Sequence, residues 1–428
     1  MQDTVAREQV SRVASFNGIN VYKMWTDRFK TNTINIFFHD RLSAENAARN
    51  AIVPAVLRRG CERFKTFQDI ALYLEELYGA SFDCGVAKKG ERQIMQFYIE
   101  YVSDRYTGED TSLFEKAFDL LHEIVTRPFL ENGMFRNDYI EQEKENLKKL
   151  IESRINDKVQ YAVDKCFEEM CSDEPFGVYE YGSVKDLSGI NCKDLYSHYL
   201  KMLETYPVDV FIAGDVEDEK IQYAVNKLAQ IRRGDIKQVD PGTVDKEVDQ
   251  VKNVVEKMSV SQGKLSLGFR TNTSPSHRDY YPLLVFNVIL GGGMHSKLFQ
   301  NVREKESLAY YAFSRLEKFK GLMVVSSGIE IKNKDRAQEI ILKQIEDIKN
   351  GNISDYEYDA TLKTIETGLK SLRDSQLQMV DFFLSQDVAG SSDDLDSLIE
   401  KSKKVSKQDV VNIAKKIKLD TVYFLTAK

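Results

Sequence analysis

The stretch Leu290-Gly-Gly-Gly-Met-His-Ser-Lys-Leu-Phe-Gln-Asn-Val-Arg303-Glu-Lys-Glu-Ser-Leu-Ala-Tyr310 separates an apolar helix from a β-strand. Residues 264–270 before it alternate as in a strand, and residues 281–290 form an apolar helical segment. We expect the glycine cluster Gly291, Gly292 and Gly293 to end that helix, with a further helix at 297–304 and strands at 309–316 and 321–331. The stretch therefore predicts helices packed on an antiparallel sheet.

The same order of elements recurs in the first half of the chain, with strands at 18–25, 31–39, 94–102 and 208–213 and helices between them. The tripeptide from Asp209 resembles the one from Asp420. We therefore predict an α+β fold of two homologous α/β-sandwich halves, each an antiparallel-rich sheet covered by helices. The predicted domains are residues 1–217, a terminal helix and charged linker at 218–258, and residues 259–428.

The composition is that of a globular protein with sizeable cores. Of its 428 residues 42% are hydrophobic and 30% charged, and 60 Lys and Arg oppose 67 Asp and Glu without any block of like charge. This balance argues against a nucleic-acid partner. No signal-peptide pattern or membrane-spanning stretch is evident, so we expect no membrane partner and a cytoplasmic location. The five cysteines form no C-x-x-C pair and are expected to be reduced thiols.

Several familiar catalytic signatures are missing. None of the five histidines lies three or four residues from another, so no helix presents a pair of zinc-binding histidines. The chain has no G-x-S-x-G elbow and no phosphate-binding G-x-x-x-x-G-K-[ST] loop. Hydrolase and nucleotide-binding functions therefore lose their main sequence support.

The run from Leu290 to Tyr310 resembles the pitrilysin/insulinase family, the inverzincin peptidases that include mitochondrial processing peptidase. With the duplicated halves, the resemblance covers nearly the whole chain. It implies that the chain is half of a clamshell-type dimer that closes around an unfolded peptide. It also implies that Arg303 and Tyr310, seven residues apart, clamp the substrate, and that the glycine-rich loop lies near the incoming peptide.

The family's zinc signature, H-x-x-E-H, is absent from this chain. Alignment of residues 57–61, LRRGC, with the family's L-F-K-G-T places the signature on residues that cannot bind zinc: Ala51, Ile52, Val53, Pro54 and Ala55. The resemblance also implies a glutamate ligand on a later helix. That helix carries Glu143, but the ligand position seven residues on is Leu150.

Without these ligands, we expect no catalytic residue, no metal site and no cofactor on this chain. A methyl group offers no lone pair to zinc, and no other group here would lower the pKa of a water molecule toward neutrality. Proline is also expected to bend or restart the helix at position 54. The glutamates Glu141, Glu143 and Glu145 are expected to form a solvated helix face rather than an acid site.

The favoured function is that of a noncatalytic subunit of a heterodimeric zinc metallopeptidase. Its partner would be a homologous chain with H-x-x-E-H that carries the zinc, while this chain binds and orients the peptide through Arg303, Tyr310 and the glycine cluster. The alternatives are a structural or adaptor protein, like related core subunits of the respiratory cytochrome complex, or a homodimeric peptide-binding protein. In a purely structural role, Arg303 would pair with Glu304 or Glu306, Tyr310 would lie in the core and the glycines would only form a turn.

Overall fold

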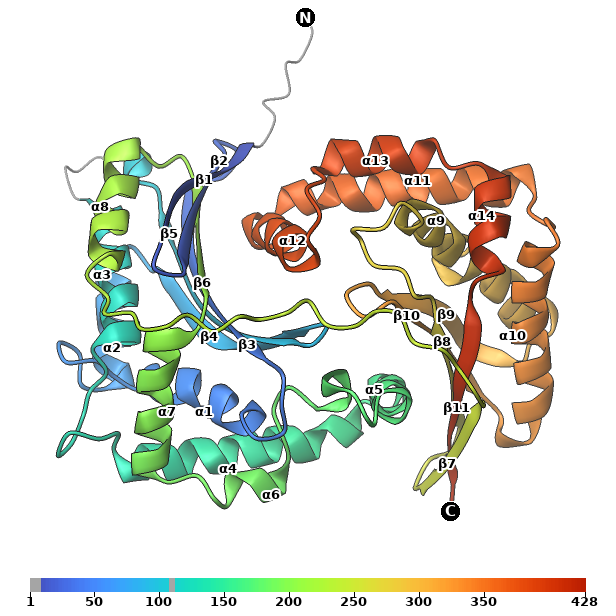
Figure 1. Ribbon diagram of the computed structural model, residues 1–428, viewed down its shortest axis with the longest axis horizontal. Coiled ribbons are helices and arrows are strands. Elements are labelled where there is room, and N and C mark those ends of the chain that lie inside the picture. Colours follow the sequence, from blue (N-terminus) through green and yellow to red (C-terminus); the bar gives the residue numbers. More distant parts are fainter. Residues whose placement is uncertain (1–8, 108–111) are drawn as a thin grey trace, which may run out of the picture. The chain divides into compact units, whose positions relative to one another are not determined.

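The computed structural model describes residues 9–107 and 112–428 (Figure 1). Its contacts divide the chain into two compact units. The described residues of the first unit are 9–107, 112–152, 178–240 and 376–381, and those of the second are 153–177, 241–375 and 382–428.

The first unit is built on a sheet with the strand order β1-β2-β6-β3-β5-β4. The strands are β1 (Gln9–Phe16), β2 (Ile19–Trp25), β3 (Thr31–Arg41), β4 (Ser81–Lys89), β5 (Arg92–Val102) and β6 (Val208–Gly214). Alternate residues of β3, among them Ile34, Ile36 and Phe38, join one core with the helices. The helices are α1 (Ala47–Leu57), α2 (Phe67–Glu76), α3 (Leu113–Thr126), α4 (Asn137–Ser153), α6 (Val184–Leu187), α7 (Cys192–Thr205) and α8 (Asp218–Leu228).

The second unit has the strand order β7-β11-β8-β10-β9. The strands are β7 (Lys252–Met258), β8 (Gly263–Arg270), β9 (Ala309–Glu317), β10 (Leu322–Ile329) and β11 (Lys418–Ala427). Its helices are α5 (Lys158–Met170), α9 (Tyr280–Gly291), the π-helix η4 (Leu298–Lys305), α10 (Lys334–Lys349), α11 (Asp355–Ser371), α13 (Leu395–Lys403) and α14 (Lys407–Ala414), while α12 (Gln376–Ala389) contributes residues to both units.

Both faces of the second sheet are covered, which explains why every residue of β10 is buried. Leu322 and Val324 pack with α5, whereas Met323 and Val325 join the core on the opposite face. Figure 1 shows α5 and α10 on opposite sides of this sheet. Alternation along one strand thus supplies two apolar layers.

The two sheets share one topology. In the first unit β6 pairs in parallel with β2 and antiparallel with β3, and in the second β11 pairs in parallel with β7 and antiparallel with β8. By the same order β5 corresponds to β10 and the edge strand β4 to the edge strand β9. The predicted α+β architecture with two similar halves is confirmed.

Two features differ from the predicted organisation. Residues 252–258, assigned to a charged linker, form the strand β7, whose alternating exposure suits a solvated sheet edge. Residues 153–177 precede the predicted boundary at 217 but group with the second unit, because Val163, Phe167 and Met170 of α5 pack on its sheet.

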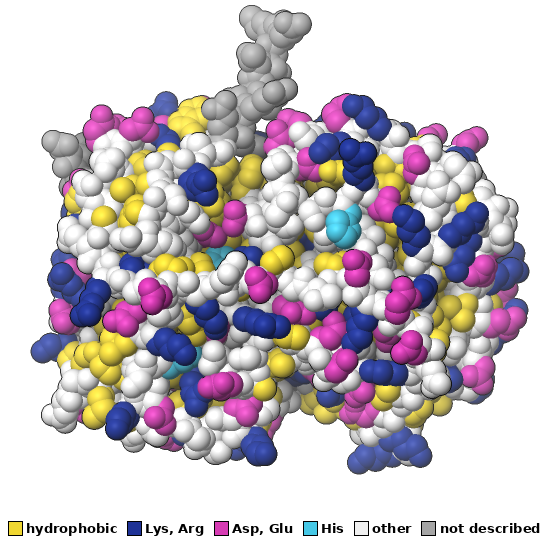
Figure 2. Space-filling model, viewed as in Figure 1, with side chains coloured by type: hydrophobic (Ala, Val, Ile, Leu, Met, Phe, Trp, Pro, Cys, Tyr) yellow, Lys and Arg dark blue, Asp and Glu magenta, His cyan; other side chains and the backbone are white. Residues whose placement is uncertain are grey.

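The surface is mixed in charge. On the face shown in Figure 2, Lys and Arg side chains are interspersed with Asp and Glu over most of the surface. Among the described residues, no helix has the length and hydropathy needed to cross a membrane.

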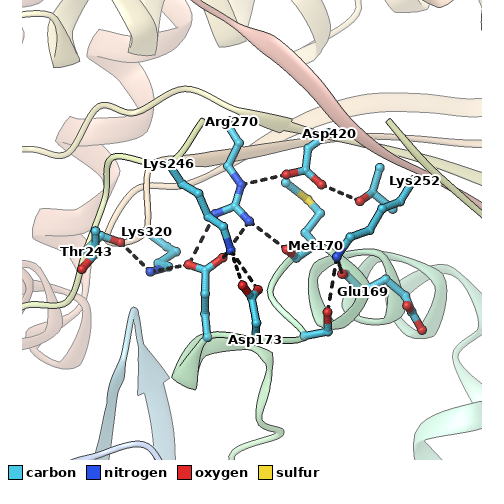
Figure 3. A network of polar contacts seen from close by, with 12 residues as sticks. Glu169, Met170, Asp173, Thr243, Lys246, Lys252, Arg270, Lys320 and Asp420 are labelled. Atoms are coloured by element: carbon cyan, nitrogen blue, oxygen red, sulfur yellow. Dashed lines mark hydrogen bonds and ion pairs between the residues drawn. The ribbon is translucent and has the colours of Figure 1, made fainter. Parts of the chain in front are cut away.

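A buried charge network holds the second unit together. Glu174 accepts from Lys246 Nζ at 2.9 Å, Arg270 Nη2 at 2.7 Å and Lys320 Nζ at 2.7 Å, and Arg270 Nε also reaches Asp420 Oδ2 at 2.9 Å. The Arg270 and Lys320 side chains are only 1% exposed. Figure 3 shows Lys246, Arg270 and Lys320 converging from separate segments, with Asp420 on the other side of Arg270. Burial disfavours the ionised Glu174, but its hydrogen bonds to Arg270, Lys320 and Lys246 prevail and lower its pKa to about 2.

We predict that Glu174→Gln lowers the free energy of unfolding by about 3 kcal/mol, because Arg270 and Lys320 would stay buried with one counter-charge fewer. The control is Asp173→Asn, since Asp173 meets Lys246 with 70% of its side chain exposed, and it should cost less than about 1 kcal/mol. Urea unfolding followed by circular dichroism measures both values. Equal losses would show that burial does not strengthen the Glu174 network.

The same carboxylate predicts a pH dependence. Its folded pKa of about 2 lies below the ordinary value of 4.5, so its stabilising contribution is present above pH 4.5 and is lost as the pH falls toward 2. Between these pH values, the wild-type protein should lose more stability than Glu174→Gln. Parallel stability curves for the two proteins would contradict the assignment.

Candidate functional site

A pocket of about 530 Å³ in the first unit lies where α1, α4 and the edge strand β4 meet. Both segments that the family resemblance relates to metal binding face it, since α1 contributes Ala51 and Ala55 and α4 contributes Glu143 and Leu150. The remaining wall residues are Ile52, Arg58, Arg59, Phe67, Cys84, Gly85, Val86, Asn146, Leu147 and Tyr181.

Helix α1 runs through Pro54 without interruption, contrary to the expected bend or restart. Nine of its eleven residues are buried, so its packing offsets the hydrogen bond that proline removes. The Pro54 carbonyl accepts from the Arg58 N–H at 3.1 Å and from the Cys84 thiol at 3.2 Å. Because the helix stays regular, Ala51 and Ala55 lie one turn apart on the same face.

Glu143 is buried, which corrects its assignment to a solvated helix face. Arg59, just beyond the end of α1, donates through Nε and Nη2 to Glu143 Oε1. The second carboxylate oxygen, Oε2, accepts from Asn146 Nδ2 at 3.2 Å. An ion pair therefore joins α1 to α4 and occupies the one acidic group that lines this pocket.

The residues of the pocket do not fit a zinc ion. Glu143 is neutralised by Arg59, and the positions implied by the resemblance offer only the apolar side chains of Ala51, Ala55 and Leu150. Burial raises the pKa of the Cys84 thiol to about 12, so this possible sulfur ligand stays protonated at neutral pH. Within residues 9–107 and 112–428, no group of three or more His, Cys, Asp or Glu is arranged to hold a metal ion.

Arg303 and Tyr310 lie in the second unit, on η4 and β9 respectively, two elements that pack together. The Arg303 side chain is 45% exposed, lies 4.7 Å from the Phe299 ring centre and has its Nε 3.6 Å from Glu304. Tyr310 is 58% exposed, so it is not a core residue. The intervening turn is fixed by a hydrogen bond of 3.0 Å from Leu308 N–H to the Val302 carbonyl.

The three glycines end α9 by close packing rather than by a left-handed turn. Gly291 closes α9, and a Cβ there would lie 2.3 Å from the Ser314 backbone nitrogen on β9. The capping residue Gly292 has φ −91°, an ordinary backbone angle, and a Cβ there would meet Val288 at 2.6 Å. Gly291 is thus required for packing, while Gly292 and Gly293 are exposed.

Arg59 is the main site residue to which no role was assigned from the sequence. It belongs to the LRRGC segment that set the alignment, but its partner Glu143 is 84 positions away. The hint in the sequence is that Arg59 follows closely after residues 51–55, where the family's zinc ligands are absent. Only the fold shows that this cation pairs with Glu143 in the pocket that the resemblance relates to metal binding.

The fold and the pocket define a peptidase-like protein whose metal-binding positions are filled by groups unsuited to zinc. Residues 189–365 match the family model described as "Peptidase M16 inactive domain". A Bacillus subtilis protein named "Probable inactive metalloprotease YmfF" is 35% identical over 408 residues, covering 95% of this chain and 96% of its own. The chain belongs to the M16 peptidase family, which is the pitrilysin/insulinase family of the sequence resemblance, and is an inactive homologue within it.

Solved structures show the same fold. A conserved protein from Enterococcus faecalis V583 has a TM-score of 0.91 at 28% identity and covers 98% of this chain and 99% of its own. The peptidase M16 inactive domain from Pseudomonas fluorescens has a TM-score of 0.80 at 16% identity over 98% of each chain. The second likeness concerns the fold alone.

We predict that Arg59→Ala lowers the free energy of unfolding by about 2–4 kcal/mol, because Glu143 would remain buried without a cation. Arg58→Ala is the matched control, since Arg58 approaches the exposed Asp83 at 3.8 Å and lies over the half-exposed Phe67 ring, and it should cost under about 1 kcal/mol. The double change Arg59→Met with Glu143→Met should regain most of the loss. Chemical unfolding measures all three, and no recovery in the double variant would contradict the pairing.

A metal site should be recoverable if the two helices face one pocket as described. The variant Ala51→His/Ala55→His/Leu150→Glu places two histidines and a carboxylate on that pocket, and we expect zinc binding that the wild-type protein lacks. Adding Arg59→Gln should tighten it further by removing a nearby positive charge. Competition with a chromophoric chelator measures the affinity. The control Ala51→His/Ala55→His should bind zinc more weakly; equal affinity would place residue 150 outside the site.

Proposed function

We propose that this chain is the noncatalytic, substrate-binding subunit of a heterodimeric zinc metallopeptidase. Its partner is a homologous chain with an intact H-x-x-E-H motif, and the hydrolytic chemistry belongs to that partner. The observation that carries the proposal is a pocket whose acidic group, Glu143, is paired with Arg59, in a chain that presents Arg303 and Tyr310 to solvent.

The exposure of the two side chains supports a role outside the chain's own core. Arg303 has only a peripheral contact with Glu304, and its guanidinium stacks on Phe299, which limits its motion. Tyr310 is more than half exposed on a strand whose other residues are mostly less exposed. Both side chains are therefore available to a ligand without breaking a buried interaction.

Strand β9 supports peptide binding by strand addition. In its described sheet it is an edge strand that pairs with β10, so an extended peptide could add to its outer edge. Tyr310 lies near its beginning, just after the helix that carries Arg303. A peptide along β9 would bring a carbonyl oxygen within reach of a guanidinium and a phenol, both of which are donors.

These donors suit stabilisation of the negative charge that forms on a peptide carbonyl oxygen during hydrolysis. Removal of one such donor typically lowers the rate by about 10²- to 10³-fold. In the proposed enzyme, the partner cleaves the bond while this chain orients the peptide and contributes the two donors. Gly292 and Gly293, exposed after α9, would leave room for the peptide backbone.

The test uses the complex that an affinity-tagged copy of this chain forms in its own cell. Mass spectrometry should identify a co-purifying chain with H-x-x-E-H, and the complex should cleave an internally quenched fluorogenic peptide. Arg303→Ala and Tyr310→Phe should each lower kcat/KM by about tenfold or more while the complex stays assembled.

The matched controls lie on the same unit. Arg336→Ala removes an arginine whose side chain is 54% exposed, and Tyr356→Phe removes the hydroxyl of a tyrosine that is 71% exposed. Both should retain full turnover. Unchanged turnover in Arg303→Ala and Tyr310→Phe, or a tagged chain that assembles with no such partner, would overturn the proposed function.

A further inference from the structure

The pocket between α1, α4 and β4 offers apolar contact and one available cation. Its apolar walls come from α1, α2, α4 and β4 and are wide enough for a large side chain: Ala51, Ile52, Ala55, Phe67, Val86, Leu147 and Leu150. Two of them, Phe67 and Leu150, are 45% and 44% exposed. Large apolar side chains that stay partly exposed around a concave surface are typical of ligand-binding sites.

Most polar groups of this pocket are already satisfied within the chain. Arg59 and Asn146 bind the two oxygens of Glu143, and the Cys84 thiol donates to the Pro54 carbonyl. A ligand therefore gains little by presenting hydrogen-bonding groups to the interior, whereas an apolar group loses nothing by entering it.

Arg58 differs from the other polar groups. Its guanidinium lies 5.3 Å from the centre of the Phe67 ring, and its nearest carboxylate, that of the exposed Asp83, is 3.8 Å away. The distance to Asp83 is too long for a hydrogen bond, so the donors of Arg58 remain available for a carboxylate at the rim. The pocket thus favours an apolar group with an acidic neighbour.

The strand beside the pocket indicates what carries these groups. Cys84, Gly85 and Val86 of β4 line it, and β4 is an edge strand that pairs with β5 in its described sheet. A Cβ placed on Gly85 would have no atom within 4 Å, so the space over this residue is open. An extended peptide could therefore approach the β4 backbone closely and pair with it.

We propose that the former metal pocket is a side-chain pocket for an extended peptide that pairs with β4, with a large apolar residue inside the pocket and an acidic residue next to it facing Arg58. The inference deepens the proposed function, because it adds to the peptide-binding role a second contact and a preferred substrate class. It needs neither the partner chain nor a metal.

The test measures binding of fluorescein-labelled peptides to the purified full chain by fluorescence anisotropy. The reference peptide is an extended Thr- and Val-rich decamer with a central Phe-Glu pair, and its relatives carry Ser-Glu or Phe-Lys there. We expect at least tenfold weaker binding for Ser-Glu, and weaker binding for Phe-Lys. N-methylation of alternate residues should weaken binding in one of the two registers, because it removes the donors that pair with β4.

Two changes in the protein test the same contacts. Ala55→Trp fills the pocket and should weaken binding of the Phe-Glu peptide at least tenfold, whereas Ala71→Trp, at a half-buried alanine of α2 outside the pocket, should not. Arg58→Glu, just after α1, should weaken binding of the Phe-Glu peptide and restore binding of the Phe-Lys peptide, whereas Arg49→Glu within α1 and outside the pocket should do neither. If Ala55→Trp does not fold, Leu150→Asp, at an exposed wall position, serves instead.

The outcomes separate the two proposals. Equal peptide affinity in Ala55→Trp and Ala71→Trp, or no charge reversal with Arg58→Glu, overturns the pocket assignment whatever the complex does. If Arg303→Ala abolishes turnover while the pocket variants keep their peptide affinity, the proposed function holds and the pocket assignment is wrong. If Arg303→Ala keeps full turnover while the pocket variants lose peptide affinity, the pocket assignment holds and the role of Arg303 is wrong.

Discussion

The ion pair between Arg59 and Glu143 is the interaction on which the pocket of the first unit depends. It fixes the segment after α1 to the middle of α4, beside a pocket with mostly apolar walls. A guanidinium with donors in a rigid fork suits a carboxylate, and Asn146 binds the oxygen that the fork leaves free. The pair supplies the positive charge that compensates the buried Glu143 carboxylate.

The second unit also compensates its buried charges by ion pairs, but at a different place in the fold. Its buried charges gather around Glu174 and Arg270 near the start of β11, whereas the corresponding strand of the first unit, β6, has Asp209 3.0 Å from the buried His39. Asp209 and Asp420 were recognised from the sequence as equivalent positions. Both anchor a buried cationic or protonatable partner on the neighbouring antiparallel strand, so the duplication preserves the carboxylate while its partner varies.

The architecture could be predicted to a large extent from local patterns. The apolar residues of β3, the unbroken apolar run that begins β10 and the helical spacing of α10 are strong signals because buried faces impose them. Strand β7 was missed because a solvated edge strand carries lysines that resemble a linker.

Of the candidate site, only the residues implied by the family resemblance could be predicted from the sequence. The resemblance related Ala51, Ala55 and Leu150 to one site, and in the structure these three residues line one pocket. The burial of Glu143 and the role of Arg59 depend on a contact between positions 84 residues apart, which no local spacing reveals. The continuous helix through Pro54 likewise depends on the packing around it.

The apolar lining of this pocket also bears on how such a protein changes over generations. A histidine or glutamate arising alone at position 51, 55 or 150 would gain no metal and would face apolar neighbours, with Arg59 already holding the nearby carboxylate. Each such change made alone therefore brings a cost without a benefit. The apolar lining makes the gain of a metal site depend on several substitutions occurring together.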